Sequence, residues 1–186
     1  MSYYPFIKNY MGHISDVFPV QYYIIKKTLG LFPKSSTSEF LKISPITDNI
    51  YLSGINGANN LDEIKIYNIT YIINCTKDIP NYFENDNIKY MRVPIDDTSN
   101  QHIEQYFDST YNFIENAIIN KCNILVHCYA GISRSATILI AYFMRKYNIS
   151  YMKAYEFVKS KRSIINPNKE FVEALKEYQI TLNILN

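Results

Sequence analysis

Between residues 123 and 144 a short apolar run ends in a cysteine, and a small-residue loop then leads into a second apolar run. The first run, NILV, has the length of a buried strand, and SATILIAYFM after Arg134 has the length of a buried helix. A strand joined to a helix by a tight loop is the unit of sheets that carry helices on their faces. This stretch therefore restricts the chain to α/β folds.

The same alternation of strand and helix patterns runs from about residue 43 to the end. Strands are predicted within 44–54 and at 69–75, 88–95 and 123–126. Helices are predicted within 59–68, at 101–120, after 134, at 151–162 and from 168 onward. We therefore expect one α/β domain, with a central mixed, partly parallel sheet of about five strands flanked by helices.

The first 42 residues differ in composition from the rest. They carry five lysines against Asp16 and Glu39, are rich in aromatic residues, and end in the linker-like PKSSTSEF. We interpret residues 1–42 as a basic, aromatic extension with a linker, and residues 43–186 as the folded domain. The extension could pack on the domain, bind an acidic partner or mediate self-association.

Composition disfavours several classes of protein. A net charge of +2 on 186 residues is too small to indicate nucleic-acid binding. No run of about 20 uncharged apolar residues predicts a membrane span. Three cysteines without framework spacing favour a reducing compartment, and no secretory signal pattern is found at Met1. A cytoplasmic, or else nuclear, location is expected.

The loop from Cys128 to Arg134 combines the requirements for binding an anion and attacking it. Gly131 permits a positive φ, so the backbone can curl and point its N–H groups inward. The following helix adds its dipole, and Arg134 can grip two oxygens of a phosphate. Thiols at helix N-termini ionise readily, so Cys128 is expected to be a nucleophile. The simpler interpretation of a strand-end cysteine is a small buried hydrophobe.

The string VHCYAGISRSAT resembles the signature loop of the cysteine-dependent protein phosphatases, most closely that of the dual-specificity branch. The resemblance covers about 43–180, including ITDNIYLSG, YIINCT, VPIDDTSNQHIEQYF and INPNKEF. It implies an active phosphatase that removes phosphate from phosphotyrosine and phosphoserine or phosphothreonine of proteins. The reaction goes through a phosphocysteine and needs no metal or cofactor.

The resemblance also implies the role of each site residue. Cys128 attacks phosphorus, while Arg134 and the loop hold the oxygens. His127 keeps the thiolate ionised, and Ser135 assists its departure. The general acid is Asp97 or its neighbour Asp96, and motif alignment favours Asp97. Substrate-binding positions are those of the loop: Tyr129, Ala130, Gly131, Ile132, Ser133 and Arg134.

The neutral side chains within the loop disfavour polyanionic lipid substrates. Segment 76–90 offers no counterpart of the aromatic recognition loop of the tyrosine-only branch, which predicts a shallow pocket. Tyr129 either lines the mouth of this pocket or is a surface aromatic without a role.

Cys75 is interpreted as a core residue, although some relatives protect the nucleophile as a reversible disulfide. The alternatives are a pseudophosphatase that only binds phosphoproteins, and an RNA 5′-phosphatase, which the lack of a basic stripe disfavours.

Overall fold

The computed structural model describes residues 42–98 and 100–184, so the predicted extension, apart from Lys42, lies outside the described residues. The elements in chain order are β1 (Ser44–Pro45), β2 (Ile50–Ser53), α4 (Ile55–Ala58), α5 (Leu61–Ile66), β3 (Ile69–Asn74), β4 (Lys89–Arg92), the 3₁₀ helix η1 (Ile103–Tyr106), α6 (Phe107–Ile119), β5 (Asn123–His127), α7 (Arg134–Tyr147), α8 (Tyr151–Lys161) and α9 (Lys169–Thr181).

The strands form one mixed sheet in the order β1-β2-β5-β3-β4. β2, β5, β3 and β4 run parallel to one another, and β1 pairs antiparallel with β2. His127 at the end of β5 lies in register with both Ser53 and Asn74, which end the two neighbouring strands. The predicted α/β domain with a partly parallel sheet is confirmed, and three strand ends meet at one edge.

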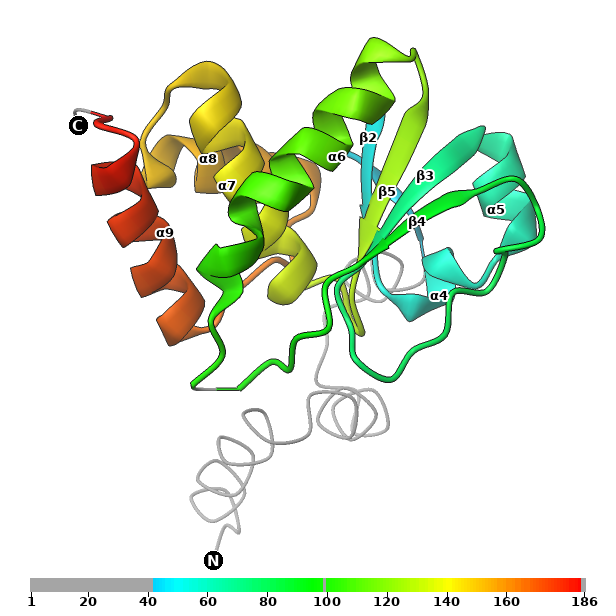
Figure 1. Cartoon of the computed structure of the whole chain (residues 1–186), viewed down its shortest axis with the longest axis horizontal. Coiled ribbons are helices and arrows are strands. Elements are labelled where there is room, and N and C mark those ends of the chain that lie inside the picture. The colour runs from blue at the N-terminus through cyan, green and yellow to red at the C-terminus, as the bar shows by residue number, and fades with distance from the viewer. Residues whose placement is uncertain (1–41, 99, 185–186) are drawn as a thin grey trace, which may run out of the picture.

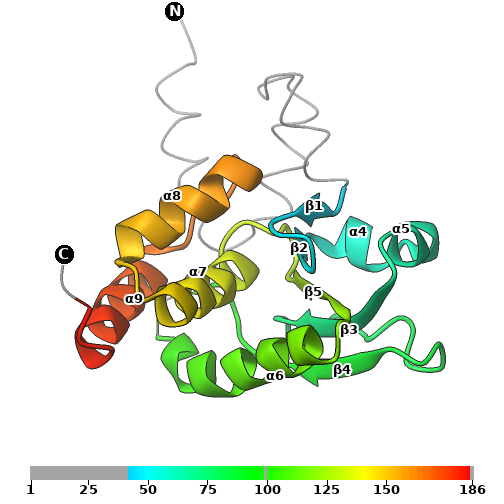
Figure 2. The same cartoon turned by 90° about the horizontal axis from the view of Figure 1, so that it is seen from above.

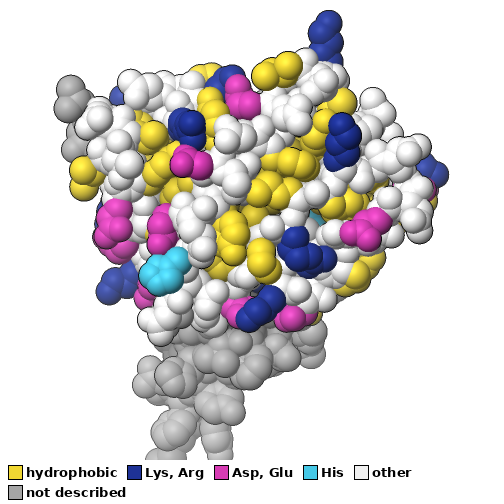
Figure 3. Space-filling view, viewed as in Figure 1, with side chains coloured by type: hydrophobic (Ala, Val, Ile, Leu, Met, Phe, Trp, Pro, Cys, Tyr) yellow, Lys and Arg dark blue, Asp and Glu magenta, His cyan; other side chains and the backbone are white. Residues whose placement is uncertain are grey.

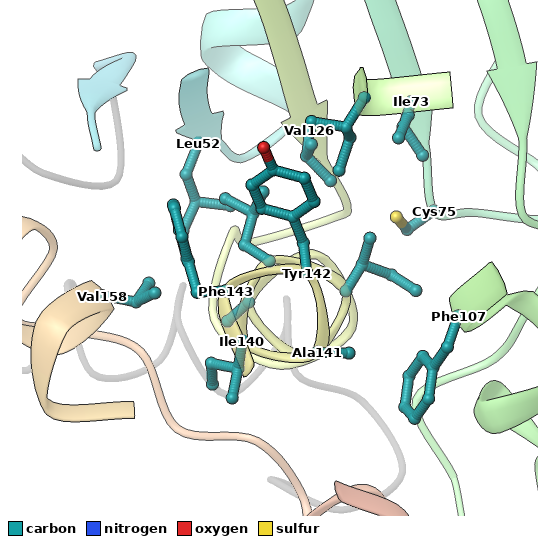
Figure 4. Close-up of a cluster of buried hydrophobic side chains, with 14 of the residues drawn as sticks. Leu52, Ile73, Cys75, Phe107, Val126, Ile140, Ala141, Tyr142, Phe143 and Val158 are labelled. Carbon is teal, nitrogen blue, oxygen red and sulfur yellow. The ribbon is translucent and has the colours of Figure 1, made fainter. Parts of the chain in front are cut away.

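Helices cover both faces of this sheet. Figures 1 and 2 show α6, α7, α8 and α9 on one face and the short helices α4 and α5 on the other. Figure 4 looks along α7 and shows side chains of the sheet, α6 and α8 packed around it. Every α7 residue from Arg134 to Met144 is buried. Since burying one large aliphatic side chain contributes about 1.5–3 kcal/mol, this packing holds the beginning of α7 firmly against β5.

Local sequence explains most element boundaries. β3 and β5 are buried on both faces, which is why their sequences are continuous apolar runs. Asn60 caps α5 by accepting from the N–H groups of Asp62 and Glu63. The four-residue helix α4 was not predicted because it is too short to show periodicity. No helix within residues 42–98 and 100–184 is long and apolar enough to cross a membrane.

Candidate active site

The Cys128 loop, residues 128–133, connects the end of β5 to the beginning of α7. Gly131 has a φ of +67°, a conformation that side chains strongly disfavour. A Cβ there would also lie 2.6 Å from the backbone carbonyl of Ser53. Position 131 therefore requires glycine for two reasons: the loop turns there with a positive φ, and it packs closely against the end of β2.

The backbone carbonyls of the Cys128 loop are held by donors from outside it. The carbonyl oxygens of Tyr129, Ala130, Gly131 and Ile132 accept from Ile55 N (2.9 Å), Arg162 Nη2 (3.2 Å), Arg162 Nε (2.9 Å) and Asn166 N (2.9 Å). Because a trans peptide points its N–H away from its C=O, the amides that follow these carbonyls face the opposite side. Such inward amides make an anion-binding nest.

The Cys128 thiol lies within this nest and is almost fully buried, with 1% of its surface exposed. Gly131 N–H donates to its Sγ at 3.3 Å, and the Ser135 hydroxyl donates to it at 3.1 Å. Ser135 belongs to the first turn of α7, whose dipole also favours negative charge here. Two hydrogen-bond donors therefore point at this sulfur.

Arg134, the first residue of α7, is buried beside the loop. Its Nη1 donates to the carbonyl of Ile95 at 3.1 Å, which links the loop to the segment after β4. Its Nε is buried with no hydrogen-bond partner among the described residues, and lies 3.7 Å from Asp97 Oδ2. Because buried donors are nearly always satisfied, this guanidinium retains capacity for an anionic oxygen.

The neighbours Asp96 and Asp97 lie in different surroundings. Asp97 Oδ1 accepts from the Ser133 hydroxyl at 2.7 Å and from Asn168 Nδ2 at 2.9 Å. Its side chain is 18% exposed, whereas that of Asp96 is 40% exposed and pairs with Lys77 at 3.2 Å. The structure therefore brings Asp97, and not the carboxylate of Asp96, against the Cys128 loop.

His127 is buried at the end of β5. Its surroundings together lower its pKa from 6.5 to about 4: burial has the largest effect, a hydrogen bond to the backbone of Cys128 opposes it, and the charges of Arg92 and Arg134 add to the lowering. Its Nδ1 has no partner among the described residues. The imidazole is therefore neutral near pH 7, and it is joined to the nucleophile through the backbone.

Tyr129 is 36% exposed, while its neighbours Ala130 and Ile132 are partly buried. An aromatic side chain from segment 76–90 also lies near it. Burial raises the pKa of Tyr82, and the nearby Tyr129 phenol raises it further. No sequence pattern indicated this proximity, because the two residues come from separate loops.

Cys75 directly follows β3, next to the nucleophile. Its N–H donates to the carbonyl of His127 at 2.8 Å, which extends the pairing of β3 and β5 by one step. Burial raises the pKa of the Cys75 thiol well above its usual value, and Cys128 adds to the rise. Both cysteines are free thiols in this structure, and Cys75 is fully buried in the core, as interpreted from the sequence.

The site contains residues that sequence reasoning missed. Asn168 was interpreted only as the start of the last helix, yet its amide also holds Asp97. Arg162 and Ile55 hold carbonyls of the Cys128 loop, and nothing in their local sequence signals this. No three His, Cys, Asp or Glu side chains gather as a metal-binding group in the described part of the chain.

This fold and loop agree with what is found in known proteins. The family model for the dual specificity phosphatase catalytic domain matches residues 50–181. The chain therefore belongs to the dual specificity phosphatase catalytic domain family, as the signature loop predicted.

Individual relatives support the same assignment. Human dual specificity protein phosphatase 7 is 43% identical over 136 residues, which cover 73% of this chain and 32% of that protein. The crystal structure of DUSP15 has a TM-score of 0.70 at 31% identity, covering 77% of this chain and 96% of that one. That of the human tyrosine phosphatase-like serine/threonine/tyrosine-interacting protein has a TM-score of 0.71 at 30% identity, covering 76% and 97%. The chain spans about a third of the length of curated relatives such as human dual specificity protein phosphatases 6 and 7.

Proposed function

We propose that this chain is a protein phosphatase that hydrolyses phosphate monoesters of phosphotyrosine and of phosphoserine or phosphothreonine through a phosphocysteine. The observation that carries the proposal is the Cys128 sulfur. It accepts hydrogen bonds from Gly131 N–H and Ser135 Oγ at the N-terminus of α7. A sulfur with two donors in an anion-binding loop is equipped as a nucleophile toward a phosphoryl group.

In the first step Cys128 Sγ attacks phosphorus and the bond from phosphorus to the ester oxygen breaks. The inward amides and Arg134 stabilise the charge on the three equatorial oxygens. Asp97, which the Ser133 hydroxyl and the Asn168 amide hold beside the loop, gives its proton to the departing oxygen. The protein alcohol or phenol then leaves as a neutral group.

In the second step water attacks the phosphocysteine. Asp97, now a carboxylate, takes the proton of that water, and the bond from phosphorus to sulfur breaks. The sulfur leaves as a thiolate, which the Ser135 hydroxyl stabilises by its hydrogen bond to Sγ. Inorganic phosphate is released and the starting state is restored.

The neutral loop side chains favour phosphoprotein over polyanionic lipid substrates. On the face shown in Figure 3, Lys and Arg side chains are scattered among Asp and Glu, which disfavours an RNA substrate. The phosphoprotein-binding alternative has a relative whose name says "tyrosine phosphatase-like". The chain favours catalysis over that alternative because Cys128, Arg134, Asp97 and Ser135 are all present and assembled in one place.

The test is hydrolysis of an aryl phosphate in the presence of a chelator, by the wild type and by Cys128→Ser. We expect turnover by the wild type alone, followed by release of phosphate from both phosphotyrosine and phosphothreonine peptides. A folded wild type that binds these peptides without releasing phosphate would instead establish the binding function. Release of phosphate only from RNA 5′ ends would overturn the protein-substrate proposal.

A further inference from the structure

Arg162, the C-cap residue directly after α8, is wholly buried, which is rare for arginine. Its guanidinium bridges two parts of the chain. Nε and Nη2 donate to the carbonyls of Gly131 (2.9 Å) and Ala130 (3.2 Å), and Nη1 donates to Ser44 Oγ (2.9 Å) and the carbonyl of Lys42 (3.3 Å). One planar group therefore joins the Cys128 loop to the beginning of β1.

The two carbonyls that Arg162 holds decide where two loop amides point. The Ala130 carbonyl and the Gly131 N–H belong to the same peptide unit, and no cis peptide bond is present in the described chain. With the carbonyl turned toward Arg162, the N–H must point the opposite way. It is this N–H that donates to Cys128 Sγ at 3.3 Å. By the same geometry, the Gly131 carbonyl sets the direction of the Ile132 N–H.

Glycine makes this stretch of backbone unusually free to rotate. Gly131 can adopt positive or negative φ at similar cost, so its flanking peptides can flip unless something holds them. Arginine suits this task because its fork is rigid and its charge is permanent, whereas lysine presents a single flexible ammonium.

We propose that Arg162 is a positioning residue that keeps the amides of Gly131 and Ile132 turned toward Cys128 and the bound phosphoryl group. Arg162 touches neither substrate nor the reacting sulfur. It acts only through the backbone of the loop. The inference rests on the proposed function only in taking the bound anion to be a phosphoryl group.

The experiment measures alkylation of Cys128 by iodoacetamide, followed by mass spectrometry of the Cys128 peptide, so it needs no turnover. Inorganic phosphate should protect Cys128 in the full chain. In Arg162→Lys we expect half-protection to need about tenfold more phosphate. The reason is that the Gly131 and Ile132 amides are no longer held toward the anion, so phosphate loses hydrogen bonds from the loop.

Arg92→Lys is the matched control. Arg92 donates to the carbonyls of Thr76 (3.0 Å) and Ile79 (2.8 Å) and so holds the loop after β3 in a comparable way. Its replacement should change phosphate protection by no more than about twofold. An equal loss of protection in both variants would mean that either substitution destabilises the whole fold, and it would overturn the inference. Unchanged protection in folded Arg162→Lys would also overturn it.

Ser44→Ala covers the case in which Arg162→Lys does not fold. It removes one acceptor of the guanidinium on the side away from the loop and leaves every loop residue in place. A smaller shift in the same direction, about twofold, supports the inference, and no shift in this variant counts against it. Turnover of an aryl phosphate by the same wild-type preparation tests the proposed function separately.

Discussion

β3 and β5 are neighbouring parallel strands, and a buried cysteine directly follows each of them. Cys128 follows β5 and accepts two hydrogen bonds at the beginning of α7. Cys75 follows β3, the loop after it is held by Arg92 and Asn74, and among the described residues the next helix begins only at Ile103. The same residue type at the same edge of one sheet thus has two different environments.

The two environments differ because the segments after the two strands differ. Burial raises the pKa of the Cys75 thiol well above its usual value, so it stays protonated near pH 7. Cys128 is buried as well, but its sulfur accepts hydrogen bonds from the Gly131 N–H and the Ser135 hydroxyl and lies at the N-terminus of α7. A strand end supplies the location of a buried thiol, and the loop and helix after it supply the hydrogen bonds that the Cys128 sulfur accepts.

The largest expected effect comes from exchanging each cysteine for serine. Cys128→Ser should lower turnover of an aryl phosphate by at least about a thousandfold, because it removes the nucleophile. Cys75→Ser should stay within a few-fold of the wild type and only lower stability, since the hydroxyl replaces a buried sulfur. Comparable losses of turnover in the two folded variants would contradict the claim that only the cysteine after β5 acts in turnover.

The second effect separates the two carboxylates after β4. Asp97→Asn should slow turnover by about a hundredfold or more, as loss of a general acid does. Asp96→Asn should change it by about twofold at most, because Asp96 forms an exposed ion pair with Lys77. The measurement is kcat of both folded variants at saturating aryl phosphate. The reverse ranking would overturn the assignment.

A smaller effect is expected at Asn168, which caps α9 and also holds Asp97. Asn168→Asp keeps the capping acceptor but removes the donor to Asp97 and repels its carboxylate, so Asp97 is no longer held beside the loop and kcat should fall by about tenfold. Asn60→Asp at the N-cap of α5 is the matched control, and it should leave kcat unchanged. If both substitutions have the same effect on kcat, Asn168 serves only as a cap.

The last effect is on stability rather than on turnover, and it concerns His127, the position in register with Asn74. Its folded pKa of about 4 lies below the ordinary value of 6.5, so the unfolded chain binds the proton first as pH falls. Its contribution to stability is complete above pH 6.5 and is lost between pH 6.5 and 4, by about 3 kcal/mol at most. His127→Asn, which makes the end of β5 like that of β3, should flatten this pH dependence.

Urea unfolding between pH 7 and pH 4.5 measures the His127 effect. His102→Gln is the control, because the side chain of His102 is 78% exposed. That variant should keep the full wild-type slope of unfolding free energy against pH. A wild-type slope that persists in His127→Asn would show that other groups account for it.

Much of the fold could be predicted because its signals are local. Buried parallel strands have continuous apolar sequences, as in β3 and β5, and Asn60 and Asn168 mark helix starts by capping. The short helix α4 escaped because four residues are too few to show a period. The 3₁₀ turn at Ile103–Tyr106 was likewise merged into the helix predicted after residue 101.

The Cys128 loop could be recognised from sequence alone, because glycine, cysteine, serine and arginine stand there close together and each acts through its own chemistry. The partners that complete the site emerged only when the chain was folded. Tertiary packing placed Asp97 rather than Asp96 against Ser133, and it brought Arg162 against the Gly131 carbonyl. These pairs are 36 and 31 positions apart, so their contacts depend on how the sheet and helices pack rather than on any local pattern.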